Sequence, residues 1–258
     1  MTARRWSLRG IVFVYLGALL LAPVVFVFYK TFQHGVGPVW DSVTTPAAQS
    51  AFTLTLELAA IAVPLNTIFG VAMALALVRG RWRGKAIVEA IIDLPFAVSP
   101  VIIGLALLLT FGRQGWLHLP FQVIFALPGM ALATVFVSLP FVVREVAPVL
   151  REVGDEQEQA ASTLGATRWQ AFWRITLPSI RWGIAYGVVL STARAIGEFG
   201  AVSVVSGDIA GRTETLTLLV QKRFGNFDLA GAYAASALLA VIALATLLTM
   251  TTTRRRAT

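Results

Sequence analysis

Long apolar runs separated by short polar or basic stretches form the main pattern along this chain. We predict six membrane-spanning helices, at residues 11–29, 52–78, 86–111, 121–143, 182–206 and 229–250. Each run approaches or exceeds the roughly 20 helical residues that cross a bilayer core. The apolar stretch 215–220 is too short to span, and we expect it in a re-entrant or interfacial outer helix. The pattern predicts a single-domain, all-α membrane protein.

Prolines interrupt several of these predicted spans. Pro64 lies inside the second span, where neighbouring helices can satisfy the freed carbonyl. Pro95 and Pro100 both lie in the third span, so this helix should break or kink strongly. Transporters often use broken helices to present backbone groups to an ion, and a purely structural kink is the alternative. Pro95, Ser99 and Pro100 are therefore candidates for a translocation pathway.

Basic residues are distributed unevenly between the predicted loops. They gather at the amino terminus (Arg4, Arg5, Arg9), in the Arg79–Lys85 loop, in segment 144–181 and in the Arg254–Arg256 tail. Because cytoplasmic loops carry an excess of Lys and Arg, six spans place both termini in the cytoplasm. The first run is too long for the apolar core of a cleaved signal peptide, so we expect a retained helix. We divide the chain into a first helix with its outer loop (1–50), a membrane-spanning core (51–253) and a basic tail (254–258).

Composition excludes several classes of function. The 258 residues are 57% hydrophobic and only 13% charged, whereas about a quarter of a soluble domain is charged. The net charge of +8 follows from the basic loops, so no nucleic-acid partner is expected. There is no cysteine, and His34 and His118 form no ligand spacing, so no metal site is expected. The Gly80–Lys85 stretch lacks the spacing of a phosphate loop, so no nucleotide cofactor is expected in this chain.

The polar segment 144–181 has the pattern of two short helices. Two helix starts are predicted by an acceptor followed three residues later by Glu or Gln, at Asp155 with Glu158 and at Thr167 with Gln170. Gly165 falls where the first helix should end, because a left-handed residue after a helix favours glycine. Pro178 should close the segment. Helices this short are not stable alone in water, so we expect them to dock onto a partner.

This segment resembles the cytoplasmic motif of ATP-binding-cassette importer permeases, which reads Glu-Ala-Ala, three residues, Gly, nine residues, Ile, one residue, Leu-Pro. The match consists of Gln159-Ala160-Ala161, Gly165, Ile175 and Leu177-Pro178, with Gln159 in place of the usual Glu and Glu158 beside it. In that family the loop between spans four and five forms coupling helices that enter a groove on the ATPase. The resemblance implies the type I importer permease fold and ATPase coupling through Glu158, Gln159, Ala160, Ala161, Gly165, Ala166, Thr167, Arg168, Ile175, Leu177 and Pro178.

The same resemblance implies an assembly, because a permease without a nucleotide site cannot power itself. It implies two copies of an ATPase subunit, which bind ATP and Mg, and a second homologous permease subunit. It also implies an external substrate-binding protein, periplasmic or lipid-anchored, and a place among the lipids of the bacterial cytoplasmic (inner) membrane. The chain itself would be a transport subunit and no enzyme.

The fifth predicted span carries small and charged residues at helical spacing on one face: Gly183, Gly187, Ser191, Arg194 and Glu198. The glycines permit close helix contact. Arg194 falls near mid-membrane, where a charge seldom faces lipid, and Glu198 is one turn further on. This face either lines the pathway, with Arg194 attracting an anion, or holds a structural ion pair. Ser191, Arg194, Glu198 and Ser203 are kept as pathway candidates.

Finer resemblance concerns the substrate. Residues 62–66, 93–100 and 193–202 resemble the sulfate and thiosulfate permeases of the CysW type, and the similarity extends over nearly all of the chain from the second span onward. Molybdate and tungstate permeases share much of the last two stretches and are the alternative. Sulfate would imply a heterodimer of permeases, whereas molybdate permeases typically pair with themselves. A secondary transporter driven by an ion gradient is the rival class, with Glu57, Asp93 and Glu198 as its candidate carboxylates.

Overall fold

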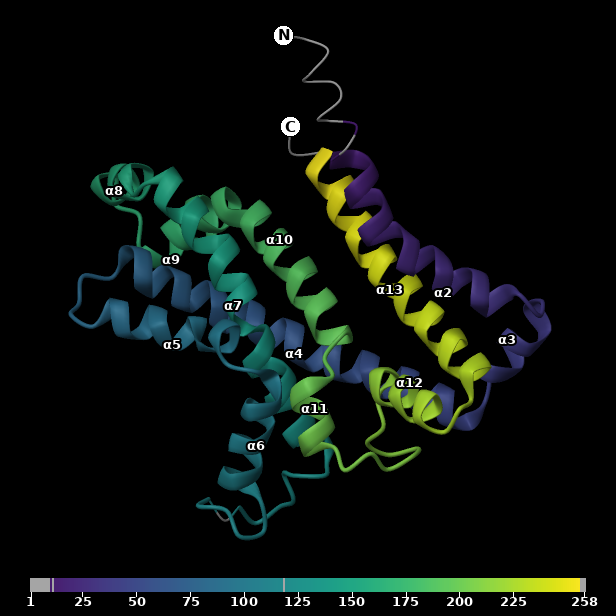
Figure 1. Ribbon diagram of the computed structural model, residues 1–258. Helices are drawn as coiled ribbons and strands as arrows, with labels where there is room; N and C mark the ends of the chain where they lie inside the picture. The colour runs from purple at the N-terminus through teal and green to yellow at the C-terminus, as the bar shows by residue number, and fades with distance from the viewer. Residues whose placement is uncertain (1–9, 11, 118, 256–258) are drawn as a thin grey trace.

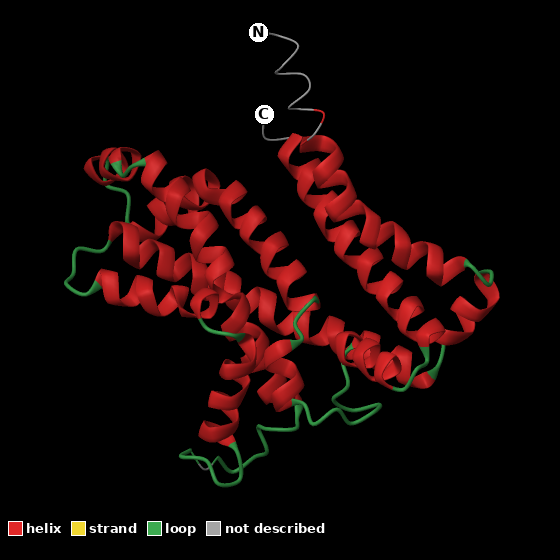
Figure 2. Cartoon of the chain, viewed as in Figure 1, coloured by secondary structure: helices red, strands yellow, loops and turns green. Residues whose placement is uncertain are grey.

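All elements that the structure describes are helical (Figures 1 and 2). The computed structural model describes residue 10 and residues 12–117 and 119–255. The sequence predictions for Arg4, Arg5, Arg9, His118 and Arg256 therefore lie outside the described residues. The elements are η1 (Gly17–Leu21), α2 (Ala22–Phe32), α3 (Val36–Val43), α4 (Pro46–Arg79), α5 (Lys85–Ala97), α6 (Pro100–Phe111), α7 (Leu127–Val153), α8 (Glu156–Thr163), α9 (Arg168–Ala171), η2 (Phe172–Thr176), α10 (Leu177–Ile196), α11 (Gly200–Val205), α12 (Leu216–Gly225) and α13 (Leu229–Arg255). The all-α prediction is confirmed for this part of the chain.

Length and apolarity mark fewer than six helices of the described chain as spans. Four helices qualify, at Val12–Phe32, Pro46–Arg79, Leu127–Val153 and Leu229–Thr246, and the bent pair α5–α6 counts as a fifth. α10 is not among them, and it carries Arg181 and Arg194. The predicted third and fifth spans are therefore not single straight helices.

Two predicted helix starts differ from the structure. α4 begins at Pro46 rather than residue 52, since the Thr45 side chain accepts a hydrogen bond from the Ala48 N–H and proline suits the first helical position. The predicted outer loop 31–50 therefore contains α3 and the first turn of α4. α7 begins at Leu127 rather than residue 121 and continues to Val153. It therefore extends ten residues into the polar segment 144–181, which we call the coupling segment.

The predicted break in the third span is confirmed. α5 and α6 meet at 111°, and Ser99, with ψ 135°, is the extended residue before Pro100. A residue that precedes proline is disfavoured in the helical region, so Pro100 accounts for the break. Pro95 remains inside α5 and does not end that helix.

The predicted fifth span differs from the structure at both ends. Pro178 does not close the coupling segment, because η2 joins α9 to α10 without a gap and Pro178 lies in the first turn of α10. The wider π-helical turn and a helix start both tolerate the missing N–H of proline. At the other end α10 stops at Ile196, and α11 begins at Gly200 after a short corner.

Helices α4, α7 and α10 pack closely because glycines face Val142. A Cβ atom added to Gly70 would lie 2.7 Å from the Val142 Cβ, and one added to Gly187 would lie 2.9 Å from the Val142 Cα. Gly183 makes a similar approach, 3.0 Å from the Glu145 carbonyl oxygen. The prediction that Gly183 and Gly187 permit close helix contact is confirmed.

α13 packs on α10 and α12 on one side and carries α2 and α3 on the other. α13 packs along α2 and α3 (Figure 1), and the Thr31 hydroxyl donates to the Tyr233 carbonyl oxygen at 3.0 Å. Thr31 is the only buried residue of α2. In Figure 1 the start of this first helix and the end of α13 lie side by side, in the same upper part of the view as α8.

Candidate functional site

The turn after α8 has the glycine cap that the sequence predicts. Gly165 has φ +87°, and its N–H donates to the Ser162 carbonyl at 3.0 Å. The next N–H, of Ala166, donates to the Ala161 carbonyl, also at 3.0 Å. These two bonds form a Schellman motif, which satisfies carbonyls at the end of α8 and redirects the chain into α9.

Both predicted helix starts are confirmed, because α8 begins after Asp155 and α9 after Thr167, but only the second has the predicted capping box. Thr167 and Gln170 exchange both hydrogen bonds, at 2.9 and 3.3 Å. Asp155 precedes α8, but its side chain caps nothing there. The Glu158 carboxylate instead accepts from the Arg79 guanidinium and the Thr176 hydroxyl. A charge-assisted bond to a cation is stronger than a bond to an exposed neutral N–H, which explains the choice.

Apolar side chains on the coupling segment point away from the rest of the chain. Leu164 is 89% exposed, Trp169 68% and Trp173 50%. Phe172 joins the two tryptophans in a cluster with ring centroids 5.4 to 6.0 Å apart. An exposed apolar patch on an otherwise polar segment is typical of a protein–protein contact. Gln159 is also exposed.

Arg79, which sequence analysis treated only as a cytoplasmic charge, connects four elements. It is the last residue of α4, and its guanidinium donates to the carbonyls of Leu150, at 3.3 Å, and Gly154 at the end of α7. The same group pairs with Glu158 of α8 at 3.2 Å. Thr176 of η2 donates to the same carboxylate oxygen at 2.8 Å. The sequence carried no signal for these contacts, since they join residues far apart in the chain.

A second group of candidates meets at the corner between α10 and α11. Arg194 Nη1 lies 2.5 Å from Glu198 Oε2, and the Glu198 side chain is 2% exposed. The other Glu198 oxygen accepts from the Ala201 N–H at 2.8 Å and so caps α11. Pro100 of α6 packs against this corner, 2.9 Å from the place of a Cβ on Gly200. The predicted pair is thus present, and it holds the corner together.

The other pathway candidates lie at different depths around this corner. Pro95 is buried within α5, and Ser99 is exposed at the start of α6. Ser203 uses its hydroxyl to bond a carbonyl of its own helix. Ser191 is fully buried, and its hydroxyl has no hydrogen-bond partner among the described residues.

A buried polar contact between α4 and α7 was missed by sequence analysis. The Asn66 amide of α4 donates to the Ser138 hydroxyl of α7 at 2.7 Å, and the Asn66 carbonyl oxygen has no partner among the described residues. Gly70 of α4 and Gly187 of α10 both contact Val142 of α7. One helical turn from these contacts lie Asn66, Ser138 and Ser191, which we therefore place at a similar height in the three-helix core. An asparagine inside an apolar run was the available signal.

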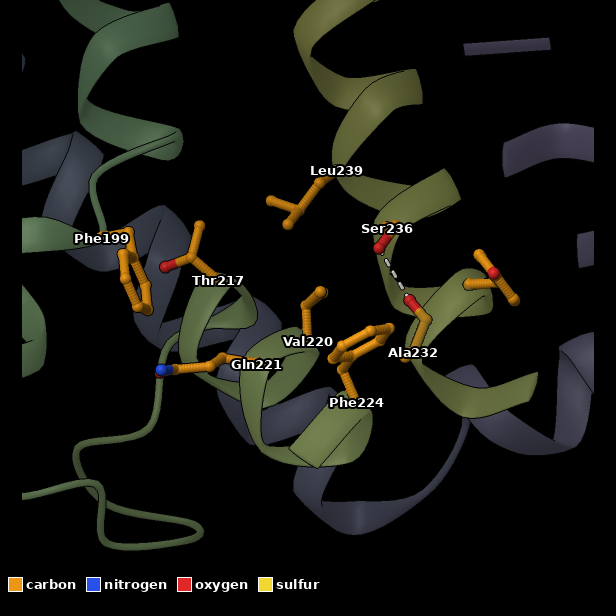
Figure 3. A pocket seen from close by; sticks show the side chains of 9 residues that line it. Phe199, Thr217, Val220, Gln221, Phe224, Ala232, Ser236 and Leu239 are labelled. Carbon is orange, nitrogen blue, oxygen red and sulfur yellow. Dashed lines mark hydrogen bonds between the residues drawn. The ribbon is translucent and has the colours of Figure 1, made fainter. Parts of the chain in front are cut away.

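An apolar pocket opens between α12 and α13, next to the α10–α11 corner (Figure 3). Its lining residues are Phe199, Thr217, Val220, Gln221, Phe224, Ala232, Tyr233, Ser236 and Leu239. The Thr217 hydroxyl donates to the Glu198 carbonyl and the Ser236 hydroxyl to the Ala232 carbonyl. Because its lining is mostly apolar and carries no basic side chain, this pocket does not suit a dianion.

The polar stretch 207–226 contains the predicted short outer helix, α12. Just before it, the buried Glu214 carboxylate accepts a hydrogen bond from Lys222 at 2.8 Å. This hydrogen bond is the main cause that raises the pKa of the Lys222 ammonium, although burial opposes the rise. The ion pair links the residue two positions before α12 to Lys222 in the second turn of that helix.

This chain is similar in sequence to several known proteins. A sulfate transport system permease protein CysW from Synechocystis sp. is 49% identical over 94% of this chain and 90% of its own length. The CysW protein of Escherichia coli strain K12 is 44% identical over 94% and 85%. A sulfate transport system permease protein CysT from the same strain is 40% identical over 89% and 84%.

Comparison of folds and of family profiles agrees with these relatives. The crystal structure of a bacterial alginate ABC transporter in complex with an alginate-pentasaccharide-bound periplasmic protein has a matching chain with a TM-score of 0.82. That match covers 98% of this chain and 96% of the other at 19% identity, and so concerns the fold alone. The profile of binding-protein-dependent transport system inner membrane components matches residues 66–256. This chain belongs to the family of binding-protein-dependent transport system inner membrane components.

Proposed function

We propose that this chain is the membrane permease subunit of an ATP-driven importer that carries sulfate or thiosulfate across the bacterial cytoplasmic membrane. The observation that carries the proposal is the coupling segment, whose glycine cap turns α8 into α9 and leaves Leu164 and Trp169 exposed. The sulfate permease relatives at 40 to 49% identity support the substrate. Family membership argues against the secondary-transporter alternative.

We further propose a topology of six crossings with both termini in the cytoplasm. In this arrangement α5–α6 and α10–α11 are broken crossings, and α12 is an outer, re-entrant segment. The basic loops support the orientation, because they precede α5 and surround α8. Figure 1 also supports this orientation, because α8, the start of the first helix and the end of α13 all lie toward the upper end of the view. The division into 1–50, core 51–253 and tail 254–258 follows the same scheme.

The proposed partners follow from the coupling segment. One subunit of an ATPase pair, which holds ATP and Mg, would receive Leu164 and Trp169 in a groove, and the other would receive the matching segment of the second permease. A second homologous permease would complete the pathway, and an external sulfate-binding protein would deliver the anion. ATP binding would close the ATPase pair and move the coupling helices, which reorients the crossings between two states. Hydrolysis would take place in the partner.

For the pathway we propose the corner where α6 meets α10 and α11. Pro100, Arg194 and Glu198 come together there. Ser99 is exposed at the start of α6, where its hydroxyl is available to an anion. Ser203 would support the corner directly, through its hydrogen bond to the Gly200 carbonyl. Pro95 and Ser191 would act from a distance, by shaping the helices around the corner.

ATP hydrolysis by the reconstituted complex tests the proposal. Loaded sulfate-binding protein should raise the hydrolysis rate several-fold, whereas loaded molybdate-binding protein should leave it at the basal level. Stimulation by the molybdate form alone would keep the importer mechanism and replace the substrate. The absence of stimulation by either protein would contradict the assignment of the coupling segment.

Replacing Gln159 with glutamate should leave sulfate uptake within about twofold of the original. Gln159 is exposed on α8, and surface substitutions away from special features change stability by about 0.5 kcal/mol or less. The change also restores the residue that related permeases usually carry. Uptake by whole cells is the measurement, and loss of uptake would show that the neighbouring Glu158 has taken over the role of that position.

A further inference from the structure

The contacts around Arg79 divide into two sets with different partners. On one side, Arg79 donates to two carbonyls at the end of α7. Among the described residues, no other side chain donates to these two carbonyls. On the other side it faces the Glu158 carboxylate. Removing that carboxylate therefore leaves the link between α4 and α7 in place and releases only the coupling segment.

Glu158 is itself shared between the two halves of the coupling segment. One of its oxygens accepts from Arg79 at 3.2 Å and from Thr176 at 2.8 Å. Glu158 belongs to α8, before the glycine turn, and Thr176 belongs to η2, after it. The Thr176 residue is 5% exposed and the Glu158 side chain 26%. The carboxylate thus ties both ends of the segment to the end of α4.

The helix that receives this connection reaches through the core. α4 packs against α7, α10 and α12, and it carries Asn66 and Gly70 of the central contacts. A displacement of α8 transmitted to Arg79 would therefore act on the three-helix core directly. A second route runs from η2 along α10. The carboxylate joins the two routes at their cytoplasmic ends.

We propose that Arg79, Glu158 and Thr176 act as positioning residues that make α8, η2 and α4 move as one body. This inference rests on the proposed function as an ATP-driven permease. It assigns the mechanical role to Glu158, one residue before the position that the family motif emphasises. The ATPase contact and the transport pathway are coupled when both favour one position of the same structural element. The connection through Glu158 makes α8, η2 and α4 such an element.

The coupling ratio of the assembled complex is the first measurement. Glu158→Ala should keep assembly and ATP hydrolysis but raise the ATP consumed per anion imported about tenfold, within the usual range of coupling energies. Thr176→Val should do the same, and Thr176→Ser should restore the ratio because it restores the hydroxyl. Glu156→Ala is the matched control, since it removes an exposed carboxylate from the same helix and should change nothing.

A distance measurement separates this inference from the proposed function, because it needs no substrate. The chain contains no cysteine, so Gln157→Cys in α8 and Ala72→Cys in α4 give two unique sites for spin labels, both at exposed residues. The label distance in the full chain in lipid nanodiscs should show one narrow distribution. It should broaden in Glu158→Ala and Thr176→Val, and stay narrow in Thr176→Ser and Glu156→Ala.

Each outcome decides the inference. A broadened distance together with a raised coupling ratio supports it. An unchanged distance in both Glu158→Ala and Thr176→Val overturns it, and so does a broadened distance with an unchanged ratio. If the original complex imports molybdate in place of sulfate, the substrate assignment fails while the comparison between variants keeps its meaning.

Discussion

Replacing Gly165 with aspartate should abolish ATP-driven uptake, by more than about tenfold, while the chain still folds. At φ +87° a side chain strains the backbone by about 1 kcal/mol, which is small against the stability of a folded domain. Among the described residues other than its two chain neighbours, none has an atom within 4 Å of the added Cβ. The loss should therefore come from contact with the ATPase, because the new charge lies beside Leu164 at the exposed turn. Uptake and ATP hydrolysis should be measured on the same purified complex.

Two control variants separate strain from docking. Gly165→Ala introduces the strain without the charge and should retain most of the uptake. Gly211→Asp places the same residue at a similar φ, +76°, also in open space, but in the loop before α12. It should transport normally. Normal uptake by Gly165→Asp would contradict the role of this turn in coupling.

Arg194→Ala should reduce the amount of assembled complex sharply. It leaves the Glu198 carboxylate, 2% exposed, without its ionic partner, and breaking a buried pair from one side costs about 3 kcal/mol or more. The Ala201 N–H remains as the only recorded hydrogen-bond donor to that carboxylate. Thermal unfolding of the purified chain and the yield of complex are the measurements.

A double variant distinguishes the structural role of this pair from a role in transport. Arg194→Met with Glu198→Gln removes both charges and keeps an acceptor for the α11 cap, so stability should return. Normal uptake by this stable double variant would leave the pair with a structural role alone. A stable complex without uptake would show that Arg194 acts on the anion. A single Arg194→Ala variant that assembles normally would contradict the structural role.

The sequence predicted elements well where the signal was local. The cap at Gly165, the capping box at Thr167 and the break before Pro100 each depend on residues within one helical turn, and all three are confirmed. The close approach of α10 to α7 was also predictable, because glycines recur every four residues. Local rules therefore gave most of the secondary structure and the position of the coupling turn.

The errors arose where distant residues decide the outcome. Glu158 leaves its expected cap because Arg79, 79 positions away, offers a charged partner. The corner at Gly197–Phe199 could not be predicted from the apolar run 182–206, because apolar residues indicate burial but not the direction of the chain. The continuation past Pro178 depends on a π-helical turn that no residue pattern announces. Contacts of this kind can be found only once the chain is folded.

The pairing of α2 with α13 has a consequence for the order of events during synthesis. The bond from Thr31 to Tyr233 joins residues 202 positions apart, so α2 meets α13 only after the residues between them have left the ribosome. Until then it has to persist alone in the bilayer, and its apolar surface allows that. In the nascent protein, the surface of α2 that packs on α13 therefore stays exposed until α13 has been made.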